Sequence, residues 1–196
     1  LPVNAFLFGV SLLFYFWGEG AGVLWLIASV VVNHLLAVLI DRKHSNVALC
    51  RFLIFVAIAA NLLFLSWFKY AGFGARIINS FLGDLIPVPE IALPLGISFY
   101  TFQAMSYVID VYRGTVRPSR SIIDFGCYVT MFPQLVAGPI VRYSDIAEKL
   151  LSRSITFDDL SYGFRRFLCG LAKKVLIANS VAQMADSVWQ FAEAGQ

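Results

Sequence analysis

Charge is scarce in this sequence. Only 14% of its 196 residues are charged, against about 25% in ordinary soluble domains, and 59% are hydrophobic. A soluble globule of this length needs a polar surface that such a composition does not supply. The net charge of +3 is also too small to indicate nucleic-acid binding. These shortages exclude a water-soluble enzyme and a disordered tail, and they predict a membrane protein that has no nucleic-acid partner.

Groups for metal, phosphate and disulfide chemistry are also few. The histidines and cysteines lie far apart in the sequence: His34, His44, Cys50, Cys127 and Cys169. The sequence contains no CxxC or HxxxH pair, no phosphate-binding loop and no dinucleotide fingerprint. We therefore expect no metal site and no bound cofactor. His34, in an apolar segment beside Asn33, is predicted to be a buried residue bonded to a neighbouring helix, the alternative being a functional residue.

Long apolar runs are what the sequence has in abundance. A helix needs about 20 apolar residues to cross a bilayer core of about 30 Å, and we expect spans at 1–17, 21–40, 47–68 and 92–109. Each run is too long and too evenly apolar for a strand. The last is unusually polar, which suits a helix buried among other helices or one that faces a wet cavity. Its polar residues are Ser98, Thr101, Gln103 and Ser106.

Basic residues in the short loops predict how these helices are oriented. Lysine and arginine are enriched in cytoplasmic loops, which places the connections at 41–51 and 110–121 in the cytoplasm. The turn at 18–20 and the loop at 69–91 then lie outside, and a short surface helix is expected at 79–85. The residues that carry this assignment are Arg42, Lys43, Arg51, Arg113, Arg117 and Arg120.

The apolar stretch at 122–141 is predicted to be broken. It holds Pro133 and Pro139, and proline removes a backbone donor and interrupts a helix. The freed carbonyl groups need partners in protein or water at membrane depth. Basic residues flank the stretch on both sides, so both of its ends are predicted to be cytoplasmic and the segment to be re-entrant. The alternative is a proline-kinked span followed by a basic external loop.

An amphipathic helix is predicted to begin at Thr156, a hydroxyl cap that is followed by two acidic residues. Apolar side chains recur after it at helical spacing, while Arg165, Arg166 and Lys173 lie elsewhere on the helix. Such a helix suits the cytoplasmic surface of a membrane, and the helical pattern continues to about residue 191. Altogether we expect an all-α, polytopic transmembrane bundle, with residues 1–196 as a single membrane domain. Transport, channel and membrane-enzyme functions all remain open at this point.

Four motifs distinguish between these functions. They are LPLGISFYTFQ (93–103), YVIDVYRG (107–114), FPQLVAGPI (132–140) and GLAKKVLIAN (170–179). In this order and spacing they closely resemble the membrane-bound O-acyltransferase (MBOAT) family, and within it the alginate O-acetyltransferase branch. The resemblance covers essentially the whole chain.

The resemblance implies a helical bundle around a funnel that thins a bacterial inner membrane. It implies an enzyme that takes an acetyl group from a cytoplasmic thioester, acetyl-CoA or a related donor, and delivers it to hydroxyls of an exported polysaccharide such as alginate. Periplasmic helper proteins complete the transfer. One alternative is D-alanyl transfer to teichoic acid on the same scaffold. The alternative from another class is a transporter, which predicts inverted repeats, and the sequence shows no repeat.

The resemblance also limits which residues can be assigned to a site. The family's catalytic histidine lies in a C-terminal half, near motifs that this sequence does not contain. Neither His34 nor His44 matches it, so no catalytic residue is assigned. We expect residues 1–196 to be an N-terminal or internal part of a longer enzyme, inactive alone, without its first helix and its catalytic half. The candidates for a substrate channel are Gln103, Pro133, Gln134, Gly138 and Pro139, with a purely structural role as the alternative.

Overall fold

The computed structural model describes residues 2–83, 87–89, 91–135, 138, 140–152 and 156–194. Every regular element among them is a helix, as the composition predicts. The chain divides into two units, Leu1–Ser152 and Arg153–Gln196, and each is described by itself. The expectation of a single membrane domain stays a prediction.

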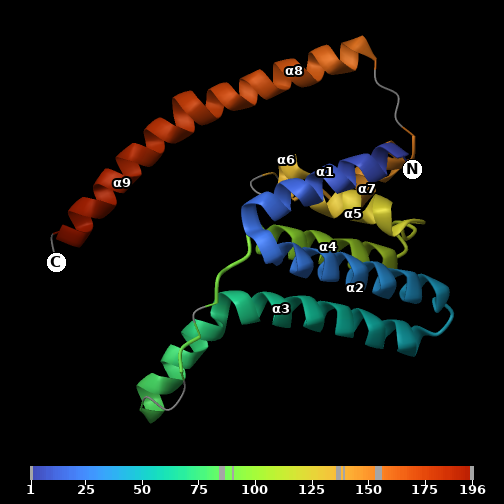
Figure 1. Ribbon diagram of the computed structural model, residues 1–196, viewed down its shortest axis with the longest axis horizontal. Coiled ribbons are helices and arrows are strands. Elements are labelled where there is room, and N and C mark those ends of the chain that lie inside the picture. Colours follow the sequence, from blue (N-terminus) through green and yellow to red (C-terminus); the bar gives the residue numbers. More distant parts are fainter. Residues whose placement is uncertain are drawn as a thin grey trace. The chain divides into compact units, whose positions relative to one another are not determined.

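The first unit begins with a helical hairpin. Helix α1 (Pro2–Glu19) is followed by the 3₁₀ turn η1 (Gly20–Gly22), and the chain then turns back into α2 (Val23–Arg42) (Figure 1). Helix α3 (Val47–Leu82) comes next. The stretches Pro2–Arg42 and Val47–Leu82 are each long and apolar enough to cross a membrane. The helices predicted at 1–17, 21–40 and 47–68 are therefore present.

Helix α3 is longer than predicted. It continues through most of the expected outer loop at 69–91, and the first residues of the surface helix expected at 79–85 are its last turn. An interior glycine such as Gly72 costs a helix only about 1 kcal/mol, and the segment holds no proline before Pro87. The helix ends at Gly83, whose φ of 82° stops it. The prediction of a loop from residue 69 was therefore wrong, because the helix continues through Gly72 and Gly74 until Gly83.

Helix α4 (Ile97–Tyr112) replaces the span predicted at 92–109. It starts five residues late because Pro94 has no amide hydrogen and Gly96 has a φ of 70°, outside the helical region. Its 16 residues rise about 24 Å, which is less than a bilayer core of about 30 Å. More than half of these residues are buried between neighbouring helices. The buried setting that its polar content indicated is confirmed.

The stretch at 122–141 is broken, as its prolines predict. It forms α5 (Ile122–Thr130) and the single turn α6 (Phe132–Leu135), and α7 (Tyr143–Leu151) follows. The 9 residues of α5 rise only about 14 Å, too little to cross a bilayer core. We call residues 122–151 the α5–α7 hairpin.

One side chain shows that this hairpin returns to its starting level. The Asn4 amide donates to Oδ1 of Asp124 at 2.6 Å, and to the carbonyl oxygen of Leu150 at 2.9 Å. The start of α5 and the end of α7 thus meet at one residue of α1. Figure 1 also places the α2–α3 turn and the α4–α5 connection at the same end of the unit. A re-entrant segment requires this path, although the side of the membrane stays a prediction.

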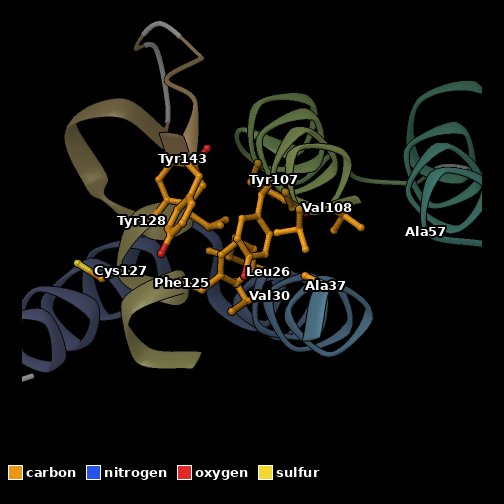
Figure 2. Packing of buried hydrophobic residues seen from close by; sticks show 14 of the residues in the cluster. Leu26, Val30, Ala37, Ala57, Tyr107, Val108, Phe125, Cys127, Tyr128 and Tyr143 are labelled. Atoms are coloured by element: carbon orange, nitrogen blue, oxygen red, sulfur yellow. The ribbon is translucent and has the colours of Figure 1, made fainter. Parts of the chain in front are cut away.

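Aromatic rings hold the α5–α7 hairpin against α4. Tyr107 of α4 stacks on Phe125 of α5, with ring centroids 4.3 Å apart, and meets Tyr143 of α7 edge-on at 4.9 Å. Tyr128 and Tyr143 are also in edge contact at 5.3 Å (Figure 2). Two hydroxyl groups add hydrogen bonds: Tyr107 accepts from the Ser119 amide at 2.9 Å, and Tyr128 donates to a backbone carbonyl at 2.8 Å. The aromatic contacts therefore fix the position of the hairpin.

Amides and one histidine provide the polar contacts of α2. Asn33 and Asn61 of α3 exchange side-chain hydrogen bonds of 3.2 and 2.7 Å, which join the two helices. His34 is buried, as predicted, and its ring stacks on Phe125 with centroids 5.8 Å apart. Its Nδ1 atom has no hydrogen-bond partner among the described residues. The contact of His34 with a neighbouring helix is thus through its ring, where a hydrogen bond was expected.

The second unit is a single run of helix. It consists of α8 (Phe157–Ala172), the π-helical turn η2 (Lys173–Ala178) and α9 (Asn179–Ala194). Thr156 caps α8 by accepting from the Asp159 amide at 3.2 Å, and the Asp159 carboxylate accepts from the Thr156 amide at 3.1 Å. This reciprocal capping box confirms the predicted start of the amphipathic helix.

Candidate functional site

The two candidate glutamines converge on one backbone carbonyl. Nε2 of Gln103, from α4, donates to the carbonyl oxygen of Tyr128 at 3.2 Å, and Nε2 of Gln134, from α6, donates to the same oxygen at 3.0 Å. Tyr128 lies near the end of α5, where the helix breaks and its last carbonyls lose their helical donors. Side-chain amides therefore take over the hydrogen bonds that proline and the break removed.

Two glycines allow the turn of the hairpin to pack closely. A Cβ on Gly96, at the start of α4, would lie 2.6 Å from the carbonyl oxygen of Leu135. A Cβ on Gly138 would lie 2.6 Å from Cα of Gln134. Pro133 lies in the first turn of α6, where a missing amide hydrogen costs least. The structure thus brings together four of the five channel candidates, and the fifth, Pro139, lies outside the described residues.

Three hydroxyl groups of α4 and α5 have no hydrogen-bond partner among the residues that the structure describes. They belong to Tyr100 and Thr101 of α4 and to Thr130 of α5, and all three residues are fully buried. Each lies within one turn of the residues that carry the Gln103–Tyr128 hydrogen bond. Buried polar groups are normally satisfied, so each of these three hydroxyls requires an explanation. We name the two glutamines and these three hydroxyls the hairpin-tip site.

The hairpin-tip site can bind and orient a polar group but offers no strong base. Amides and hydroxyls donate and accept hydrogen bonds, and none of them titrates near neutral pH. The two histidines lie elsewhere, His34 against Phe125 and His44 exposed in the turn before α3. Among the residues that the structure describes, no group of three or more potential ligands could hold a metal ion.

Sequence reasoning found only part of this site. The polar pattern of α4 marked Gln103 and Thr101, and the FPQ motif marked Gln134. Tyr100 and Thr130 were missed because tyrosine and threonine are common in apolar helices, and nothing in their spacing shows that a hydroxyl lacks a partner. The Tyr128 carbonyl is a backbone group, so only the position of the helix break indicates that it needs donors.

The chain is related to known proteins over most of its length. It is 38% identical over 188 residues to the probable alginate O-acetylase of Azotobacter vinelandii, and 36% identical over 187 residues to that of Pseudomonas aeruginosa. Each match covers 93% of this chain. The peptidoglycan O-acetyltransferase of Helicobacter pylori is 29% identical over 203 residues, which cover 90% of this chain. These matches confirm the resemblance that the four motifs carry.

The matches cover only part of the relatives. The chain spans 38% of the length of the Azotobacter protein and 36% of the length of the Pseudomonas aeruginosa protein. No protein-family model and no solved structure matches the chain.

Proposed function

We propose that this chain, a relative of part of the alginate O-acetylases of the MBOAT family, forms part of a membrane O-acyltransferase. The whole protein takes an acetyl group from a thioester on the cytoplasmic side and transfers it to hydroxyls of an exported polysaccharide. The observation that carries this proposal is the similarity to named O-acetyltransferases over more than nine-tenths of the chain. The long apolar helices α1–α3 support a place in the membrane.

The chemistry of the transfer is simple in outline. The acceptor hydroxyl oxygen attacks the thioester carbonyl, a new C–O ester bond forms, the C–S bond breaks, and the thiol leaves with the hydroxyl proton. A histidine that acts as general base on the hydroxyl fits this reaction. We assign that role to neither His34 nor His44, because His34 packs against Phe125 and His44 lies in an exposed turn. In this proposal the base is contributed from outside residues 1–196.

The hairpin-tip site supplies binding and orientation in this scheme. The buried hydroxyls of Tyr100, Thr101 and Thr130 have no hydrogen-bond partner within the described part of the chain. A carbonyl group of the passing acyl donor or a hydroxyl of the acceptor matches that capacity. Donors in a dry site also interact more strongly with developing charge than donors in water do. The two glutamines hold the hairpin in position through their hydrogen bonds to the Tyr128 carbonyl oxygen.

Transfer of labelled acetyl groups tests the proposal. Membrane vesicles that contain the full-length protein and its export partners receive acetyl-CoA labelled in the acetyl group, and label is counted on the exported polysaccharide. The Thr101→Val and Thr130→Val variants keep the side-chain shape but remove a hydroxyl, and we expect them to transfer more slowly. The matched control is Thr115→Val in the exposed α4–α5 connection. Absence of label with the unmodified protein contradicts the proposal.

Two related acceptors and one unrelated function compete with this proposal. The Helicobacter relative is named for peptidoglycan, so peptidoglycan is a second acceptor to supply in the same assay. D-alanyl transfer to teichoic acid is tested with labelled D-alanine on its carrier protein. A transporter would move an intact substrate across the vesicle membrane without forming a new ester, which separates it from all of these enzymes.

A further inference from the structure

Helix α8 has two sharply different faces. At 100° per residue, its large apolar side chains gather on one side, Arg166 and the following Lys173 lie opposite them, and Arg165 lies between the two sides. The apolar side chains are Phe157, Leu160, Phe164, Phe167, Leu168 and Leu171, all exposed in the second unit. A large exposed apolar face of this kind marks a surface that the membrane or another protein segment covers.

The opposite face of α8 forms a basic groove. The groove has a volume of about 580 Å³ and is lined by Tyr162, Arg165, Arg166, Cys169, Gly170 and Lys173. These residues recur every three or four positions, so they lie on one stripe of the helix. Gly170 leaves the middle of the stripe open, because a Cβ there would meet nothing within 4 Å.

The cations of this groove are arranged to bind an anion. The Arg166 guanidinium lies 5.7 Å from the centre of the Tyr162 ring, and its Nη1 donates to the Tyr162 hydroxyl at 3.0 Å, which raises the arginine pKa further. Nε of Arg165 donates to a backbone carbonyl at 3.4 Å, so its terminal nitrogens remain available. Lys173 completes a group of three positive charges, and no acidic side chain lines the groove. Paired guanidinium groups match the oxygens of a phosphate particularly well.

The direction of the groove selects the kind of phosphate. Because the basic stripe lies opposite the apolar face, it points away from whatever surface covers that face. Arg166 and Lys173 lie farthest from the apolar face, on the side that faces water when that face is covered, whereas Arg165 lies at the edge, where lipid headgroups are also within reach. We infer that the α8 basic groove binds the phosphate groups of a water-soluble ligand. If the proposed function holds, on which this step rests, that ligand is the acyl donor: a phosphorylated thioester of the coenzyme A type that carries the acetyl group.

Equilibrium binding of coenzyme A tests this inference. The full-length protein in nanodiscs of neutral lipid is titrated with coenzyme A and with dephospho-coenzyme A, which lacks the 3′-phosphate. A charge-assisted hydrogen bond contributes about tenfold in affinity. We expect Arg166→Gln to raise the Kd for coenzyme A by about that factor. A triple variant, in which Arg165, Arg166 and Lys173 are all replaced by glutamine, should raise it on the order of a hundredfold. The triple variant also loses most of its preference for the 3′-phosphate.

A control variant with the same change of charge separates the groove from the overall field of the protein. Arg113, Arg117 and Arg120 are exposed in the α4–α5 connection, and their replacement by glutamine also removes three positive charges. We expect this control to bind coenzyme A within about threefold of the unmodified protein, because exposed charges at a distance are screened by salt. Arg166→Lys keeps the charge but loses the planar fork, so an intermediate Kd is expected.

Several results overturn the inference. It fails if the unmodified protein shows no saturable binding of coenzyme A, or if the groove and control variants lose affinity equally. It also fails if the triple variant binds coenzyme A normally but binds anionic lipid more weakly than the unmodified protein, because the groove would then be a lipid site. The proposed function fails separately, when coenzyme A binds and no acetyl group reaches a polysaccharide. Normal transfer together with normal binding by the triple variant refutes the groove alone.

Discussion

The shared carbonyl of Tyr128 gives the sharpest test of the hairpin-tip geometry. Gln103 and Gln134 each donate to it, and either one alone still supplies a donor. Replacement by methionine keeps the length and flexibility of the side chain but removes the amide. Gln103 is 3% exposed, so Gln103→Met should cost about 1 kcal/mol, the usual net contribution of a hydrogen bond. Gln134 is half-buried, so water replaces part of its bond and a smaller cost is expected.

The double variant, Gln103→Met with Gln134→Met, tests whether the two amides share one acceptor. With both amides gone, the carbonyl loses both side-chain donors, and an unsatisfied buried group costs about 1–3 kcal/mol. The double variant should therefore be destabilised by roughly 1 kcal/mol more than the sum of the single variants. The measurement is the free energy of unfolding of the full-length protein in bicelles, taken as a double-mutant cycle. The matched control is Gln183→Met on the exposed α9 helix, which should change nothing. Strictly additive losses would show that the two glutamines do not share a partner.

Three further predictions concern the helices around this site. Asn33→Ala should destabilise the full-length protein by about 1 kcal/mol, and Asn61→Ala should add little to it, because each removes the same pair; independent losses in the unfolding measurement contradict the pairing. His34→Phe should leave acetyl transfer near its normal rate, and loss of transfer by a folded variant would give His34 a chemical role. Gly138→Ala should cost about 1–3 kcal/mol, since its Cβ has no room beside Gln134; a normal unfolding energy refutes that contact.

The positions of several helices and of one helix break could be predicted from the sequence, because each has a local physical cause. Long apolar runs give helices because a spanning backbone must satisfy its own hydrogen bonds. Prolines give the break between α5 and α6, and Thr156 with Asp159 gives the start of α8. Each of these features is local, because the residues that cause it lie within the same short stretch of sequence.

Properties that depend on distant contacts could not be read in this way. Helix α3 continues past Gly72 and Gly74, because an interior glycine only weakens a helix, and it stops at Gly83, where the backbone has a positive φ. The contact of Asn4 with both ends of the α5–α7 hairpin joins residues more than a hundred positions apart. The unpartnered hydroxyls of the hairpin-tip site are defined by what surrounds them, and no pattern in the sequence reports on that.

We propose that the α5–α7 hairpin enters the membrane and returns to the side from which it came. Labelling of single cysteines with an impermeant maleimide tests it, in full-length protein with the exposed Cys169 replaced by serine. Thr115→Cys and Ser152→Cys flank the hairpin, and Ser45→Cys and Val88→Cys mark the two predicted sides. We predict that positions 115 and 152 react from the same side as position 45 and opposite to position 88. Reaction of position 152 from the side of position 88 would contradict the claim.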